Sequence, residues 1–425
     1  MVAKLSRADQ KRVLKLVTPE EAFSRLQKAI SRTKLDYEVV SIENACGRVL
    51  AENVVSQVDI PSLNRAAVDG YAVKSKETKN ATPKTPLKLM VKGELFPSGN
   101  LGSLGLSRGE TVYLACGAPV PEGFDAVVRV EDTRRHGKEL EVCRSLEKGK
   151  NVIAVGEDVE HGSIVLNEGR LIGPYDVGML AALRTKEVKV VRKPRVAVIS
   201  VGDELTELED DEPSKTVNNY ALIVAAMASD IGASSNILGI ARDVEPEIVK
   251  KIEKALALAD IIVTIGGCSV GLKDFVPDVV NAFGKPGVIV HGIKITPGKV
   301  TGIGVVKGKP VVLLPGHIVS SVAGFHLFVA PLIRLYGGMA VLSGIEIRAK
   351  ASQNIVAKPR MQLFLRVCVK KIKDEFVAEP IHGGSSSLST LMKANGFTVL
   401  NEGATVKKGD ELTVTLFSEK ELLQL

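Results

Sequence analysis

The feature that most constrains the fold is a regular alternation of strand-like and helix-like runs from Arg195 onward. The stretch RVAVISV, which begins at Arg195, and the run at 261–265 are nearly continuous apolar segments, which is typical of strands buried on both faces of a parallel sheet. Between such runs stand segments with apolar residues at helical spacing, for example EPEIVKKIEKALAL from Glu245. This alternation predicts a three-layer α/β domain with a parallel-type sheet.

One of these predicted strands ends in an unusual loop. After residues 261–265 the chain reads GGCSVGLKD, which places Gly266, Gly267, Ser269 and Gly271 before Asp274. Ligands of open α/β sheets bind at the carboxyl ends of the strands. Glycines there let a ligand approach the backbone, and the N–H groups of a following helix start favour an anion. The alternative is a tight strand-to-helix turn that binds nothing.

Three further loops carry polar groups to the same predicted edge. They are SVGDEL with Asp203 and Glu204, HGIKITPGKVTG with Lys294, Thr296, Lys299 and Thr301, and LLPGHIVSS with Pro315, Gly316, Ser320 and Ser321. Carboxylates suit a divalent cation or the amines of a ligand, whereas lysines, glycine amides and serines suit phosphate. Singly, Glu204 could cap a helix and Lys299 could be a solvated turn lysine. Together, the loops predict a ligand site.

The regions before and after the predicted α/β domain are β-rich. Near the N-terminus a helix is predicted, with Thr18 as its N-cap and Pro19 as its first residue. At 425 residues the chain is too long for one ordinary domain. The predicted parts are a discontinuous N-terminal region at 1–57 and 152–192, an inserted β-rich domain at 58–151, the α/β domain at 193–339, and a small barrel-like C-terminal β domain at 340–425.

Composition narrows the class of protein. The net charge of +7 is spread along the chain, and the absence of Trp with only 4% aromatic residues argues against stacking on nucleic-acid bases. The five cysteines (Cys46, Cys116, Cys143, Cys268 and Cys368) are far apart, which argues against zinc and disulfides and fits a reducing compartment. The N-terminus lacks the apolar core of a signal peptide, and every long apolar run is interrupted by charged or turn residues. We therefore expect a cytoplasmic protein without a membrane span.

Taken in order along the chain, its motifs resemble those of the MoeA family of molybdopterin molybdenumtransferases, which is similar to the gephyrin E domain. The matching stretches are DIPSLNRAAVDGYAV, GAPVPEGFDAVVRVED, VGEDVEHG, VISVGDEL, NNYAL, GGCSVGLKDFVPDVV, PGKVTG and LLPGHIVSSVAGFHLFVAPLIRLYGG. Each one is moderately specific, and the ordered set, which spans nearly the whole chain, is highly specific.

The resemblance implies a reaction and an assembly. Members of the family insert molybdate into adenylated molybdopterin, release AMP and require Mg²⁺. The sequence does not distinguish molybdate from tungstate as the oxyanion. Members of the family form elongated homodimers in which the N-terminal region takes part in dimerisation, and the active site combines the α/β domain of one subunit with small-domain loops of the other. Other proteins of molybdenum cofactor biosynthesis are further expected partners.

The resemblance also assigns site residues. The acidic site positions are Asp69, Asp158, Glu204, Asp243 and Asp274, and of these Glu204 and Asp274 are expected to hold the metal ion. Lys299 matches the lysine of the Pro-Gly-Lys loop. Asn218 matches the asparagine after the GDEL strand, and Arg366 and Ser385 match positions of the C-terminal domain.

This chain departs from the family pattern at several of these motifs. The departures are Thr296 for lysine, Val300 for proline, His317 and Ile318 for asparagine and proline, Cys116 for threonine, and Leu272 for an acidic residue. Lys294 would lie on the same side of an extended segment as Thr296 and could supply the missing charge. The alternative function is therefore a divergent, non-catalytic molybdopterin-binding or scaffold paralogue.

Overall fold

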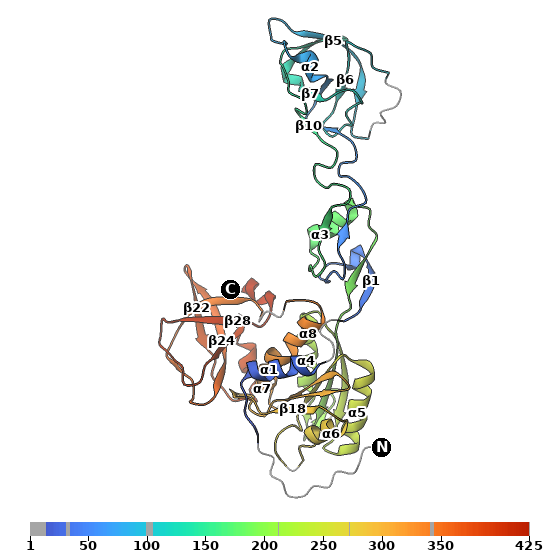
Figure 1. Ribbon diagram of the computed structural model, residues 1–425. Helices are drawn as coiled ribbons and strands as arrows, with labels where there is room; N and C mark the ends of the chain where they lie inside the picture. The colour runs from blue at the N-terminus through green and yellow to red at the C-terminus, as the bar shows by residue number, and fades with distance from the viewer. Residues whose placement is uncertain are drawn as a thin grey trace. The chain divides into compact units, whose positions relative to one another are not determined.

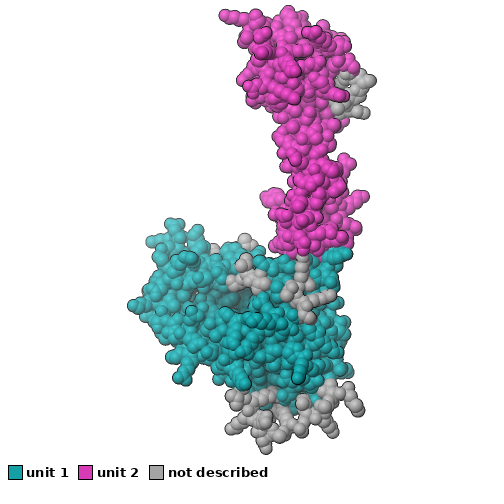
Figure 2. Space-filling view, in the orientation of Figure 1, with its two compact units in different colours: residues 1–38, 191–425 teal, residues 39–190 magenta. Residues whose placement is uncertain are grey.

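The chain divides into two compact units, residues 1–38 with 191–425 and residues 39–190, which are teal and magenta in Figure 2. The computed structural model describes residues 14–30, 35–98, 105–210, 212–271, 273–340 and 344–424. Figure 1 shows the elements of both units. The predicted four-domain division is finer than these two units and stays a prediction.

The larger unit contains the predicted α/β sheet. Its strands follow the order β16 (Ser234–Ala241), β13 (Arg195–Val201), β17 (Ile261–Ile265), β21 (Lys309–Leu314), β20 (Gly302–Val306) and β18 (Gly287–His291). The pairings among β16, β13, β17 and β21 are parallel, and those of β20 and β18 are antiparallel. The predicted parallel-type sheet is confirmed in its first four strands and carries an antiparallel edge, because β20 and β21 are joined by a short hairpin instead of a helix.

Helices cover this sheet, as the sequence pattern predicts. They are α1 (Pro19–Ala29), α4 (Asn219–Asp230), α5 (Glu245–Leu258), α6 (Val276–Ala282), α7 (Ile318–Gly324), the π-helical turn η3 (Phe325–Val329) and α8 (Ala330–Tyr336). Thr18 Oγ1 accepts a hydrogen bond from the Glu21 amide at 3.2 Å, which confirms the predicted helix start.

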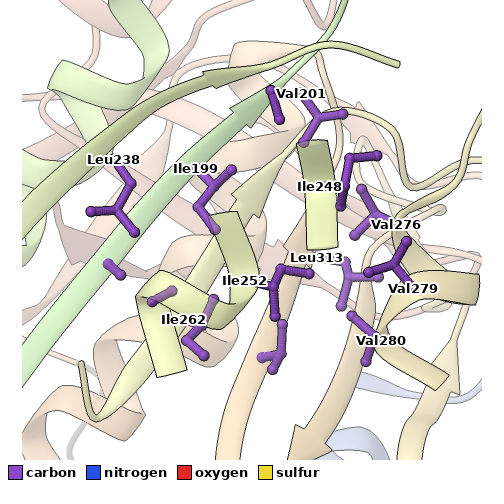
Figure 3. Packing of buried hydrophobic residues seen from close by; sticks show 14 of the residues in the cluster. Ile199, Val201, Leu238, Ile248, Ile252, Ile262, Val276, Val279, Val280 and Leu313 are labelled. Atoms are coloured by element: carbon purple, nitrogen blue, oxygen red, sulfur yellow. The ribbon is translucent and has the colours of Figure 1, made fainter. Parts of the chain in front are cut away.

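The core explains why both faces of the sheet are apolar. On α5, Ile248, Ile252 and Ala255 recur at helical spacing and are buried. They pack against alternate residues of β13, including Ile199 and Val201, and against side chains of α6 (Figure 3). The intervening residues of β13 point to the opposite face, where Ser200 donates a hydrogen bond to Asn218 at the start of α4. Layers on both faces confirm the predicted three-layer arrangement.

The segment Ile318–Tyr336 is the one helix in the described part of the chain that is long and apolar enough to cross a membrane. Most of it is buried inside the protein. A core helix of a globular domain has the same composition, because it contacts protein on nearly every side.

The C-terminal part of this unit forms a closed β structure. Its strands are β22 (Glu346–Ala351), β24 (Gln362–Ile372), β25 (Glu375–Pro380), β26 (Gly396–Leu400) and β28 (Glu411–Leu416), with β19 (Ile295–Thr296) added beside β24. The additional pairing of β24 with β26 closes the sheet on itself. The predicted barrel-like domain is therefore confirmed, and closure removes free strand edges.

The smaller unit, residues 39–190, is built on another six-stranded sheet. Its order is β7 (Ala126–Arg129), β4 (Gly70–Val73), β6 (Glu110–Leu114), β5 (Leu87–Leu95), β9 (Glu139–Val142) and β8 (Thr133–His136). The short strand pairs of this unit are β2 (Val54–Val55) with β11 (Ile164–Leu166), β3 (Arg65–Ala66) with β10 (Val152–Ile153), and β1 (Tyr37–Ser41) with β12 (Glu187–Val191). Its helices are α2 (Ser75–Thr78), α3 (Pro174–Ala182) and the single turns η1 (Ile42–Asn44) and η2 (Val130–Asp132).

Minor elements complete the larger unit. They are the pairs β14 (Leu205–Thr206) with β15 (Thr216–Val217) and β23 (Ile355–Val356) with β27 (Thr405–Val406), the helix α9 (Leu388–Met392), and the terminal turn η4 (Glu419–Gln424).

A partly buried ion pair anchors the start of β13. Asp260 accepts two hydrogen bonds from the Arg192 guanidinium, at 2.8 and 3.0 Å, and one from the Arg195 amide at 2.9 Å. Burial by itself raises the pKa of Asp260, but these hydrogen bonds outweigh it and hold the pKa below its ordinary value. A depressed pKa stabilises the fold above the unfolded-state value, about 3.9, and the stabilisation is lost as the pH falls through the folded-state value.

We therefore expect Asp260→Asn to lower the free energy of unfolding by about 2 kcal/mol at pH 7, because a charged acceptor of several hydrogen bonds is lost. The difference from wild type should shrink below pH 4 in urea titrations of the intact chain. Glu411→Gln, which breaks an exposed pair with Arg348, is the matched control and should change stability by less than about 0.5 kcal/mol. A wild-type to Asp260→Asn difference that is the same at pH 7 and pH 3 would contradict this role.

Candidate functional site

A cavity of about 230 Å³ lies in the larger unit at the loops that follow strands β13, β17 and β21. Its lining residues are Val201, Gly202, Glu204, Asp243, Gly266, Gly267, Cys268, Ser269, Lys273, Asp274, Val300, Pro315 and Gly316. The cavity therefore lies at the edge of the sheet that the sequence predicts. Of the predicted site residues, it brings together Glu204, Asp243, Gly266, Gly267, Ser269, Asp274, Pro315 and Gly316.

The glycines after β17 are required by the chain's own packing. Gly266 has φ +89°, and a Cβ added there would lie 2.3 Å from the carbonyl oxygen of Val201. Gly267 has φ +61°, and its Cβ would lie 2.9 Å from side chains of Val201 and Val276. The absent side chains make room for the end of β13 and the start of α6. Both glycines also line the cavity, and the expectation that they open space for a ligand stays a prediction.

Carboxylates form one side of the cavity. Asp203 and Asp243 each accept a hydrogen bond from the other's backbone amide at 3.1 Å, which joins the loop after β13 to the loop after β16. Burial raises the pKa of Asp243, and the charges of Asp203 and Glu204 act in the same direction. The Lys273 ammonium lies 3.0 Å from Asp203 and lowers the pKa of that carboxyl. The three carboxylates outnumber the single Lys273 ammonium, so this side of the cavity is negatively charged. It therefore favours a cation or a ligand with hydrogen-bond donors.

Asp274 is held by the glycine loop. Its Oδ2 accepts a hydrogen bond from the Gly271 amide at 2.7 Å, and a Cβ on Gly271 would lie 2.7 Å from the same oxygen. Gly271 therefore does not line the cavity but lets the backbone approach the carboxylate. This gives Asp274 a defined position before helix α6, as the sequence predicts.

Cys268 lies in the lining but is chemically inert. Its Sγ donates to the Leu314 carbonyl at 3.3 Å, and burial raises its pKa to about 12. A protonated thiol is a poor nucleophile and metal ligand at neutral pH. Sequence reasoning did not select Cys268 or Lys273, although Lys273 stands next to Asp274 in the chain.

The residues predicted to bind phosphate lie outside the lining of the cavity. Lys294, Thr296, Lys299 and Ser320 do not line the cavity. The Lys294 ammonium instead lies 3.7 Å from Glu402, and Lys299 is exposed to solvent. The loop reaches the cavity through Val300. The lysine among the lining residues of the cavity is Lys273, and the expected role of Lys294 and Lys299 toward a ligand stays a prediction.

Three other predicted residues of the larger unit are not among the lining residues of the cavity. Asn218 is buried. Its side chain accepts a hydrogen bond from the Ser200 hydroxyl and donates one to the Glu207 carboxylate at 3.3 Å. Ser385 Oγ lies 2.9 Å from His317 Nδ1, so it contacts the residue after Gly316. Arg366 is buried, donates to Thr390 and, at 3.0 Å, to the Gly383 carbonyl, and its Nε has no hydrogen-bond partner in the structure.

Asp69 and Asp158 belong to the smaller unit. Asp69 is exposed, and its Oδ1 accepts a hydrogen bond from the Cys116 amide at 2.8 Å. Asp158 is also exposed, and its own amide donates to the Ile60 carbonyl at 3.0 Å. Both residues are exposed within their own unit. Leu272 lies outside the described residues.

A preformed metal cage is absent from the described residues: none of them form a group of three or more His, Cys, Asp or Glu side chains that could hold a metal ion. The oxygen donors at the cavity, Glu204, Asp243 and Asp274, suit a hard cation such as Mg²⁺. Mg²⁺ commonly takes only one or two carboxylates and completes its shell with water and substrate phosphates. The donor set therefore fits Mg²⁺ only together with a phosphate-bearing ligand.

Comparison with known proteins matches three successive regions of the chain to family models. The MoeA N-terminal region (domain I and II) matches residues 17–183, the probable molybdopterin-binding domain matches 197–335, and the MoeA C-terminal region (domain IV) matches 348–417.

Similar proteins agree with these matches. The molybdopterin molybdenumtransferase of Bacillus subtilis is 30% identical, over 90% of each chain. Molybdopterin molybdenumtransferase 2 of Mycobacterium tuberculosis is 33% identical over 71% of this chain and 75% of its own. A crystal structure of the molybdopterin biosynthesis MoeA protein from Pyrococcus horikoshii is 33% identical with a TM-score of 0.84 and covers 95% of this chain and 100% of its own. With relatives this similar over most of its length, the chain belongs to the MoeA family, which includes the molybdopterin molybdenumtransferases of Bacillus subtilis and Mycobacterium tuberculosis.

Proposed function

We propose that this protein inserts molybdate, or tungstate, into adenylated molybdopterin with release of AMP, as a step of molybdenum cofactor biosynthesis. The observation that carries the proposal is the convergence of Glu204, Asp243 and Asp274 with two glycine-containing loops in one cavity. That cavity lies in the part of the chain that matches the molybdopterin-binding family model.

The residues of the cavity have distinct proposed roles. The loop amides near Ser269 position anionic groups of the substrate, and Asp274 and Glu204 hold Mg²⁺ together with a substrate phosphate oxygen. The metal ion would neutralise charge that develops on the departing AMP. Lys294 and Lys299 lie outside the cavity and serve as a cationic approach for molybdate or tungstate, both tetrahedral dianions. Arg366, Ser385 and Asn218 remain proposed binding residues by family membership.

The reaction can be tested directly. Purified protein is mixed with adenylated molybdopterin, Mg²⁺ and molybdate, and AMP and the metallated cofactor are measured beside a molybdenumtransferase of the same family. We expect AMP release that depends on both the oxyanion and the protein. Tight pterin binding without AMP release would instead support the non-catalytic paralogue. The departures from the family pattern that favour this alternative are Thr296, His317, Ile318, Cys116 and Leu272.

The proposal includes a homodimer in which Asp69 and Asp158 of one subunit serve the cavity of the other. Both carboxylates belong to a different compact unit from the cavity. We expect light scattering at micromolar concentration to give twice the mass of the 45.3 kDa chain.

A mixing experiment tests the shared site. Asp69→Asn and Asp274→Asn are each expected to be nearly inactive, but their coexpression should restore activity, because each mixed dimer has one site with neither substitution. A monomer in solution, or no recovery in mixed dimers, would contradict a site shared between subunits.

The cellular location and the binding partners of the protein are further predictions of this proposal. They are a cytoplasmic location, no membrane or nucleic-acid partner, and contact with other proteins of molybdenum cofactor biosynthesis.

A further inference from the structure

A second cavity, of about 280 Å³, lies in the larger unit away from the carboxylate cavity. It is bounded by α4, by the helix that runs from α7 through η3 to α8, and by the chain that follows β28. Its lining residues are Ala226, Met227, Asp230, Ile231, Phe325, His326, Ala330, Arg334, Leu416, Phe417 and Ser418. It shares no residue with the site proposed for the transferase reaction.

One wall of this cavity is aromatic. The His326 ring stacks on Phe417, with ring centres 5.4 Å apart and planes at 28°, and lies edge-on to Phe325 at 5.6 Å. Phe397 extends the cluster behind them, 4.8 Å from His326. Burial, with a further effect of the Arg334 charge, lowers the pKa of His326 to about 3. The imidazole is therefore neutral at physiological pH and belongs to an uncharged aromatic surface.

Arg334 supplies a positive charge for which the described residues provide no ion pair. It is partly buried, and within the described ranges no carboxylate lies within 4 Å of its guanidinium. Burial lowers the pKa of Arg334, and the charge of Glu419 raises it by a smaller amount. The acidic residue of the cavity lining, Asp230, is instead paired with Lys420.

A partly desolvated cation such as Arg334, whose charge is offset by Glu419 without an ion-pair contact, is energetically unfavourable unless an anionic group in contact neutralises it. An anionic group of a ligand would do so, and a carboxylate can pair with both edges of a guanidinium fork. The volume of the cavity limits the size of the ligand that can bind. A cavity of roughly 150 Å³ is enough for benzene in an engineered protein core, so this one accommodates a larger ring system with a short substituent.

We propose that this cavity is a binding site for a small aromatic carboxylate, with the ring against Phe417 and His326 and the carboxylate on Arg334. Offset stacking and edge contacts with the aromatic wall favour a planar ring. The neutral imidazole leaves Arg334 as the cation that meets the carboxylate.

The test uses the full-length protein and 1-naphthoate as the probe, with the uncharged 1-naphthamide as the matched compound. Calorimetry or ligand-observed NMR should show binding of the naphthoate and weaker binding of the amide. Arg334→Gln should weaken naphthoate binding about tenfold or more, the scale of a lost charged hydrogen-bond pair, and should leave the amide unaffected. Arg348→Gln, a change at an exposed arginine of β22, is the control and should bind like wild type.

A second variant protects the test against loss of folding. Met227→Trp places a bulky ring from α4 into the cavity and should abolish binding of both compounds while the thermal unfolding temperature stays close to that of wild type. Failure of millimolar naphthoate to bind wild type, or equal binding by wild type and Arg334→Gln, would overturn the proposal. Either result is independent of AMP release, because no residue of this cavity takes part in the proposed reaction.

Discussion

Asp274→Asn is expected to lower the rate of AMP release about 10²-fold or more while pterin binding and the fold persist. The amide side chain can still accept the hydrogen bond from the Gly271 backbone, which fixes the residue at 2.7 Å. What is lost is a full negative charge in a cavity whose other acidic groups include Glu204 and Asp243. Removal of one preorganised electrostatic group typically costs a factor of about 10²–10³ in turnover.

Asp278→Asn is the matched control for this prediction. Asp278 lies in the first turn of α6, four residues further along the chain, and is not part of the cavity lining. We expect its rate of AMP release to stay close to wild type. If Asp274→Asn also releases AMP at the wild-type rate, Asp274 only orders the loop before α6, and its proposed role in catalysis is wrong.

Gly266→Ala is expected to lower the free energy of unfolding by about 4 kcal/mol, the largest change in stability predicted here. The left-handed φ of +89° costs an L-residue about 1–2 kcal/mol. The added Cβ would also lie 2.3 Å from the Val201 carbonyl oxygen, and relief of such overpacking costs about 1–3 kcal/mol more. Urea unfolding of the variant measures the sum.

Gly284→Ala separates the two contributions. Gly284 has φ +112°, also in the region that favours glycine, but nothing lies within 4 Å of an added Cβ. Its loss should therefore be limited to backbone strain, about 1–2 kcal/mol. Equal losses for the two variants would mean that the loop after β17 can move away from Val201, and that the close contact there is not rigid.

Local patterns in the sequence were enough to predict the elements and the edge at which the cavity lies. The strand at 261–265 and helix α5 follow from the repeat of apolar residues, which depends only on near neighbours in the chain. The position of Asp274 beside the cavity follows as well, because the carboxyl ends of parallel strands share one edge.

The direction of individual side chains depended on residues distant in sequence. Lys294 approaches Glu402 because β19 joins the C-terminal barrel, and no local pattern encodes that contact. Asn218 is likewise drawn into the interior by Ser200 and Glu207.

Residue types and short spacings along the chain are enough to predict the order of strands and helices, the family, and the loops that surround the carboxylate cavity. Three findings came from the three-dimensional structure: Gly266 accommodates Val201, the lysine in the cavity lining is Lys273, and Arg334 lines a second cavity. The physical reason is that packing and charge neutralisation join groups from separate elements. Their energies depend on three-dimensional distances that periodicity along the chain does not contain.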